Sequence, residues 1–150
     1  MKKGFTILEI LIVIAILAII SAIIMGSFSM IQNNQALEKD VSTIVAYLDD
    51  AKSKTLASKD SNQYGVHFTA SSISLFKGSA YNVNDPENLN YVLSNSVTLN
   101  PITLAGGGSD VIFTRLTGGT PHSGTITASS TRTQKTKVIT IYATGGVQTN

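Results

Sequence analysis

A long apolar run close to the N-terminus is the feature that most constrains how this chain can fold. Between Phe5 and Met25 the polar side chains are Thr6, Glu9 and Ser21, and every other residue is apolar. A helix needs about 20 predominantly apolar residues to cross the hydrocarbon core of a bilayer. The run therefore predicts one membrane-spanning helix, with the rest of the chain on one side of the membrane.

Glu9 is the exceptional residue in this run. An ionised carboxylate inside hydrocarbon costs several kcal/mol unless it is paired, neutralised or close to an interface. Glu9 is therefore a candidate functional residue. The alternative is that the carboxylate lies near enough to the helix end to reach the lipid headgroups without any partner.

The residues before the run set its orientation. Lys2 and Lys3 form a basic head that holds this end in the cytoplasm, so the C-terminal part should lie outside. A secretory signal peptide also has a basic head and an apolar stretch. Here, however, the run is too long, its candidate cleavage site at residues 27–29 is weak, and Glu9 is out of place. An ordinary signal-anchor helix remains as a second explanation.

The segment from Lys3 to Glu9, KGFTILE, followed by an uninterrupted run over residues 10–20, resembles a known leader. It is similar to the class III leader of type IV pilins and type II secretion pseudopilins, over about the first 25 residues. The resemblance implies that a prepilin peptidase cuts between Gly4 and Phe5 on the cytoplasmic side. The same enzyme would then methylate the new amino group of Phe5.

This cleavage suggests what Glu9 does. It creates a positive amine on Phe5, which Glu9 of a neighbouring subunit can neutralise where water is scarce. Buried ion pairs are weak sources of net stability but good devices for setting register. We therefore expect Glu9 and Phe5 to act in assembly rather than in catalysis. The expected partners are other pilin or pseudopilin subunits, prepilin peptidase, the inner-membrane assembly platform and, before assembly, membrane lipid.

Composition limits the remaining possibilities. A chain of 150 residues has room for one membrane helix and one small domain. The absence of cysteine excludes disulfides, thiolate zinc sites and cysteine nucleophiles. Of eleven basic residues, Lys2 and Lys3 would leave with the leader, and the remaining nine balance nine acidic residues. The overall charge therefore does not favour nucleic acid as a partner.

The helix should continue well beyond the membrane, because the first proline is Pro86. Gaps of four and three predict one buried stripe on an amphipathic helix: Leu37, Val41, Ile44, Leu48, Ala51 and Thr55. The charged residues between them are expected on a solvated face: Glu38, Lys39, Asp40, Asp49, Asp50, Lys52 and Lys59. The turn-forming residues 58–62 should end a helix of about 50 residues.

The remainder has the pattern of a small antiparallel β domain. Strands are expected at 64–69, 72–76, 96–99, 110–114, 124–128 and 137–142, with a stub near Val147, and residues 78–96 should form an irregular loop. The predicted fold class is α+β, a pilin-like fold with one long helix packed on this domain. The expected organisation is a leader (1–4), a transmembrane or filament-core helix (5–26), its amphipathic continuation (27–60) and the β domain (61–150).

The second half resembles, in layout, the minor pseudopilin H and FimT-type subunits, which lie at or near filament tips and prime assembly. The resemblance covers residues 50–58 leading into 64–68, and the strands and glycine turns from 111 to 147. Some FimT-type subunits bind DNA through arginines near the C-terminal glycine. No arginine occurs at the matching residues 146–150, and this departure counts against DNA binding.

The rest of the chain offers little support for a catalytic or metal-binding site. His67 and His122 have no cysteine or clustered carboxylate near them in sequence, so packed or solvated histidines are expected. Asp85 and Glu87 flank a proline in what we interpret as a polar turn rather than a cation site. We expect no enzyme activity, no cofactor and no metal.

The favoured function is therefore a structural subunit, of the minor class, in a type II secretion pseudopilus or type IV pilus. It should be a single-pass protein of the cytoplasmic membrane that later joins a periplasmic or extracellular filament. The alternative is a DNA-binding minor pilin of a DNA-uptake filament, with Arg132, Lys135 and Lys137 as candidate nucleic-acid contacts. A third possibility is a membrane-anchored surface domain that never polymerises.

Overall fold

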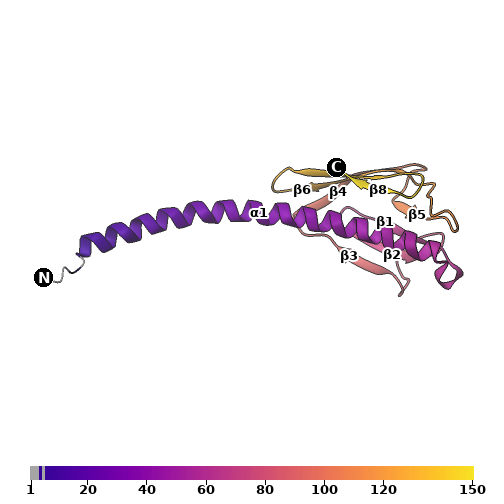
Figure 1. The fold of residues 1–150 in the computed structure, drawn as a ribbon, viewed down its shortest axis with the longest axis horizontal. Coiled ribbons are helices and arrows are strands. Elements are labelled where there is room, and N and C mark those ends of the chain that lie inside the picture. The colour runs from indigo at the N-terminus through magenta and orange to yellow at the C-terminus, as the bar shows by residue number, and fades with distance from the viewer. Residues whose placement is uncertain (1–3, 5) are drawn as a thin grey trace.

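The long helix α1 (Ile7–Leu56) dominates the structure and confirms the predicted length of about 50 residues. The computed structural model describes residue 4 and residues 6–150, and the side chains of all of these except residues 24–29. The first half of α1 projects away from the rest of the chain, and the second half lies across a β domain (Figure 1). We call the projecting half, residues 7–32, the stem.

The β domain consists of two four-stranded antiparallel sheets that pack on the second half of α1, which confirms the predicted α+β class. The first has the order β3-β2-β1-β5 and the second the order β4-β6-β7-β8. Their bounds are β1 (Tyr64–Phe68), β2 (Ser72–Lys77), β3 (Leu89–Val92), β4 (Val97–Leu104), β5 (Asp110–Ile112), β6 (Gly124–Ser130), β7 (Thr136–Ile141) and β8 (Val147–Thr149). Strands β1 and β2, which match the strands expected at 64–69 and 72–76, form an antiparallel pair with Phe68 opposite Ile73.

Two strands differ from the prediction. The expected loop at 78–96 contains β3, an edge strand whose side chains are mostly exposed and so lack the alternation of a half-buried strand. Strand β4 continues to Leu104, past Pro101, where the sequence predicted an end. Proline is tolerated there because β4 is an edge strand with a register shift between Leu99 and Ile102.

The predicted apolar stripe attaches α1 to the domain. The side chains of Leu37, Val41, Ile44, Leu48 and Ala51 are all buried, in one core cluster that also takes residues from both sheets. At the end of the stripe the buried Thr55 hydroxyl donates to the Ala51 carbonyl (2.8 Å) and accepts from the Tyr64 N–H (2.9 Å). The helix end and β1 are therefore joined by hydrogen bonds as well as by packing.

Asp40 corrects the expectation of a solvated charged face, because its side chain is fully buried. Its carboxylate accepts hydrogen bonds from the Tyr91 hydroxyl (2.7 Å), the Ser94 N–H (2.8 Å) and the Ser94 hydroxyl (3.2 Å). Burial, and then the bond to Asp40, raises the pKa of the Tyr91 hydroxyl. Asp40 thus ties the first turns of the packed helix half to the segment between β3 and β4.

We predict that Asp40→Ala lowers the free energy of unfolding by about 2 to 3 kcal/mol. It leaves the partly buried Ser94 N–H and Tyr91 hydroxyl without their acceptor, and each such loss costs about 1 to 3 kcal/mol. Thermal unfolding of the detergent-solubilised chain measures the effect. The matched control, Asp49→Ala, removes an exposed carboxylate of the same helix and should change stability by less than about 0.5 kcal/mol. Equal effects of the two substitutions would contradict the role of Asp40.

A second polar network lies where α1 ends. The Asp60 carboxylate accepts a hydrogen bond from the Tyr64 hydroxyl (3.0 Å) and lies 3.4 Å from the Lys77 ammonium, which is also 3.4 Å from Glu87. The hydrogen bond from Tyr64, and then the charge of Lys77, lower the pKa of Asp60 below its ordinary 3.8. The network links the end of the helix to β2 and to the following loop.

This network should give the fold an acid-sensitive contribution. Since the folded state lowers the pKa of Asp60, the stabilisation is present above pH 3.8 and is lost as the pH falls through the lowered value. We predict that Asp60→Asn lowers the melting temperature at neutral pH and that the difference shrinks below about pH 4. Melting curves of both proteins between pH 7 and pH 2 test this, and a difference that is constant over that range would contradict it.

Candidate functional site

Residues 7–23 of the stem present apolar side chains on every side of the helix. The large apolar residues from Ile7 to Ile23 are between 48% exposed, at Ile20, and 81% exposed, at Ile7. A helix that is apolar on every face is stable only when other helices or lipid cover it. The described residues of the chain supply no such cover. The stem therefore needs lipid or other helices around it.

Glu9 lies in the first turn of this stem. Thr6 is the N-cap residue of α1, and its hydroxyl accepts a hydrogen bond from the Glu9 N–H (3.2 Å). Thr6 and Glu9 thus occupy the N-cap and N3 positions of a capping box. A negative charge at a helix N-terminus contributes about 0.3 to 1 kcal/mol. The structure therefore gives the exposed Glu9 a local role that the sequence analysis missed.

The predicted cleavage site lies directly before the helix. Gly4 is exposed, and a Cβ atom added there would meet no heavy atom within 4 Å. The fold therefore does not require glycine at this position, and any requirement must come from an outside partner. Phe5 lies outside the described residues, so the structure gives no geometry for its amino group or for a pair with Glu9.

No helix within the described residues is both long and apolar enough to cross a membrane. The predicted span, 5–26, extends into residue 5 and into the side chains of 24–26, which lie outside that description.

The three candidate basic contacts lie on the β6–β7 hairpin. The turn of this hairpin, residues 131–135, is found at the end of the domain nearest the stem (Figure 1). Arg132 and Lys135 are exposed on the turn, whereas the Lys137 ammonium lies 3.1 Å from the Glu38 carboxylate of α1. The structure thus leaves Arg132 and Lys135 exposed on the same turn and places Lys137 in contact with the helix.

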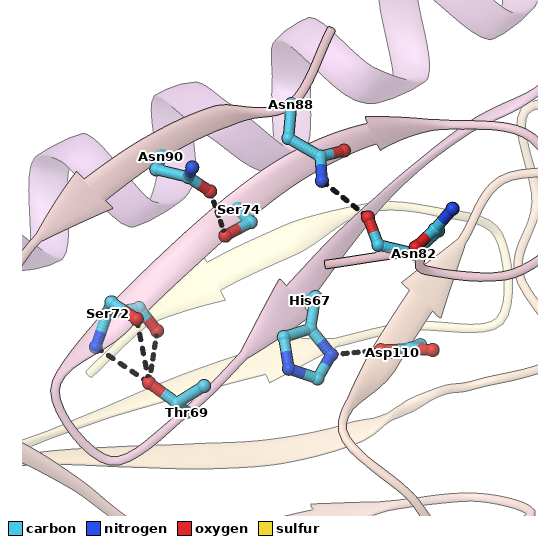
Figure 2. Close-up of polar contacts among 8 residues, drawn as sticks. All are labelled: His67, Thr69, Ser72, Ser74, Asn82, Asn88, Asn90 and Asp110. Atoms are coloured by element: carbon cyan, nitrogen blue, oxygen red, sulfur yellow. Dashed lines mark hydrogen bonds and ion pairs between the residues drawn. The ribbon is translucent and has the colours of Figure 1, made fainter. Parts of the chain in front are cut away.

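His67 is half-buried, in keeping with the expected packed histidine, but a carboxylate that is distant in sequence lies beside it. Its Nδ1 atom lies 2.5 Å from Asp110 Oδ1 (Figure 2), because His67 and Asp110 are opposite each other in the β1–β5 pair. The imidazole also stacks on Tyr81, with ring centroids 4.0 Å apart and planes at 4°. Asp110 is 43 residues away in sequence, so no local sequence pattern indicates this pair.

The His67–Asp110 pair is part of a polar row that crosses all four strands of the first sheet. Asn90, Ser74, His67 and Asp110 occupy matching register positions on β3, β2, β1 and β5. The hydroxyl of Ser74 donates to the Asn90 side chain (2.5 Å), as Figure 2 shows. A serine, a histidine and an aspartate are therefore adjacent, but the hydroxyl that a nucleophile relay would need is bound to an amide instead.

The remaining candidates are local. The Asp85 carboxylate accepts from the Glu87 N–H (2.9 Å), which confirms the predicted polar turn. His122 Nδ1 is buried and has no hydrogen-bond partner among the described residues. Over this same part of the chain, no group of three or more His, Asp or Glu side chains is arranged to hold a metal ion.

Comparison with known proteins addresses the N-terminal segment. The Prokaryotic N-terminal methylation motif matches residues 1–25, and no curated protein or solved structure has a significant match to the chain. This motif implies processing by prepilin peptidase, anchoring in a membrane before assembly, and assembly with other pilin subunits. The first 25 residues of the chain therefore carry the N-terminal methylation motif, which is the class III prepilin leader.

Proposed function

We propose that this protein is a structural subunit of a type II secretion pseudopilus or type IV pilus. The observation that carries the proposal is the combination of a prepilin leader with an exposed apolar stem that projects from a folded domain. Such a stem requires lipid around it before assembly and other stems around it afterwards. Residues 5–26 would serve first as a membrane anchor with the domain outside, and then as the filament core.

The charges near the start of the stem set the position of each subunit. Cleavage after Gly4 leaves a positive amine on Phe5, and Glu9 follows four residues later, about 6 Å along a helix. When Glu9 of one subunit meets the Phe5 amine of the next, the two helices are offset by a distance of this order. Any other offset leaves a charge without a partner in an apolar bundle, which costs several kcal/mol.

The minor, tip-located class is the finer part of the proposal. It rests on the similarity in layout to the pseudopilin H and FimT-type subunits. The alternative role, DNA binding in an uptake filament, would use the exposed Arg132 and Lys135. Two features disfavour this alternative: Lys137 is paired with Glu38, and no arginine occurs in residues 146–150.

Processing can be tested by the intact mass of the membrane-extracted chain. In cells that contain a prepilin peptidase, we expect the mass to fall by that of Met1–Gly4 and to rise by one methyl group. The same chain from cells that lack the peptidase should keep its full mass. An uncut chain in the presence of an active peptidase would contradict the proposal.

Assembly can be tested with Glu9→Gln. Glutamine also suits the N3 position of a capping box, so the helix start is preserved while the charge is removed. Breaking a buried ion pair costs about 3 kcal/mol or more, so incorporation into filaments should fall at least about a hundredfold, with membrane insertion unchanged. Filaments sheared from cells and quantified by immunoblot measure incorporation.

Thr6→Ala is the matched control for this experiment. It removes the hydroxyl that caps the Glu9 N–H but leaves the carboxylate in place. We expect this variant to assemble at nearly the level of the unaltered chain. If both variants lose assembly equally, the Glu9 charge acts by stabilising the start of its own helix rather than by pairing with a neighbour. If Glu9→Gln assembles normally, the intersubunit pair is wrong.

A further inference from the structure

The turn between β6 and β7 closes over the base of the stem. Arg132, Thr133 and Gln134 form one wall of a hollow of about 480 Å³, and Met30 and Asn33 of α1 form the other. The Thr133 hydroxyl is buried and has no hydrogen-bond partner among the described residues. Residues 132–135, together with the hollow that they border, are called the basal turn below.

The basal turn lies just beyond the end of the apolar run. From residue 26 to Met30 and Asn33 there are four to seven residues, or about 6 to 10 Å along a helix. A headgroup layer extends about 5 to 7 Å beyond the hydrocarbon core. The Debye length at physiological ionic strength is about 8 Å. When the stem spans a bilayer, the basal turn is therefore within electrostatic reach of the headgroups.

The charges of the basal turn suit an anionic surface. Arg132 and Lys135 are exposed and make no ion pair among the described residues. Of the nearby carboxylates, Glu38 is bound to Lys137, and Asp40 is buried and bonded to Tyr91 and Ser94. The turn therefore keeps two cations that neighbouring acids do not neutralise.

We propose that the basal turn binds the phosphate groups of anionic phospholipids while the subunit is anchored in the membrane, before it assembles. This proposal rests on the membrane anchoring that the proposed function includes. A planar guanidinium can bind phosphate oxygens with two parallel hydrogen bonds. Lys135 adds a second positive charge, and the Thr133 hydroxyl can donate to an oxygen that enters the hollow. The contact would hold the domain in one orientation on the membrane surface.

A DNA duplex fits this surface less well. The turn is on the end of the domain that faces the stem, so a duplex would have to lie between the domain and the bilayer. The segment 131–137 also has no aromatic residue on which a base could stack. The position and the chemistry of the basal turn both favour lipid phosphate.

The proposal can be tested with the full chain in lipid nanodiscs, either neutral phosphatidylcholine or the same lipid with one-third phosphatidylglycerol. Because the chain has no cysteine, one introduced cysteine carries a polarity-sensitive fluorophore at a single position. Thr136→Cys places the label on an exposed position beside the basal turn. Ser79→Cys places it at the opposite end of the domain, beside Arg115 and Ser61.

We expect the Thr136 label to shift to the blue on anionic discs, to lose this shift at high salt, and to show none on neutral discs. Each basic residue near an anionic surface contributes about 1 kcal/mol, or roughly fivefold. Arg132→Gln with Lys135→Gln should therefore reduce the ratio of docked to undocked domain by about 25-fold. The matched control, Lys54→Gln with Lys59→Gln, removes the same charge at the far end of the domain and should leave the shift of the Thr136 label unchanged. The Ser79 label should show no such shift.

Four outcomes would overturn the proposal. A blue shift that is equal on neutral and anionic discs, or unchanged in the double variant, excludes recognition of lipid phosphate while leaving the anchoring intact. A response of the label to a DNA duplex on neutral discs, lost in the double variant, assigns the turn to nucleic acid instead. Failure of the chain to remain in discs after alkaline washing contradicts the anchoring itself, and with it both proposals.

Discussion

The burial of one stripe of α1 is the constraint on which the rest of the structure depends. Leu37, Val41, Ile44, Leu48 and Ala51 pack into a core that both sheets share, so the second half of the helix cannot turn or slide on the domain. Because α1 is continuous over 50 residues, the same packing sets the direction of the stem. It also determines which part of the domain, the β6–β7 turn, lies beside the base of the stem.

Periodicity predicted this helix well because α1 buries one regular face. Asp40 was expected to be solvated, but it lies three residues after Leu37 and four before Ile44. The periodicity therefore places it at a buried position of the stripe. Its charge suggested solvent, but Tyr91 and Ser94, more than 50 residues later, supply the hydrogen bonds that burial requires. Position was predictable from spacing, whereas the partners depend on tertiary contacts that spacing does not contain.

The β domain was less predictable for related reasons. Strand β3 is at a sheet edge and exposes most of its side chains, so its sequence resembles a polar loop. The His67–Asp110 pair and the polar row that contains it arise from strand register, which no local pattern specifies. The N-terminal leader was predictable because its motif is a short contiguous segment, and the match to residues 1–25 bears this out, although the sequence alone had not drawn attention to Thr6 as the helix cap.

On the proposed function, charged groups act at both ends of the apolar run and in different states of the protein. In the membrane, the stem is covered by lipid, and the basal turn finds phosphate at the outer surface. In a filament, other stems replace the lipid, Arg132 and Lys135 lose their headgroups, and Glu9 gains the amine of a neighbour. Since one continuous helix joins the two ends, extraction exchanges one set of ionic contacts for the other. A subunit that has not yet met a neighbour therefore keeps its lipid contacts, which favours retention in the membrane until assembly begins.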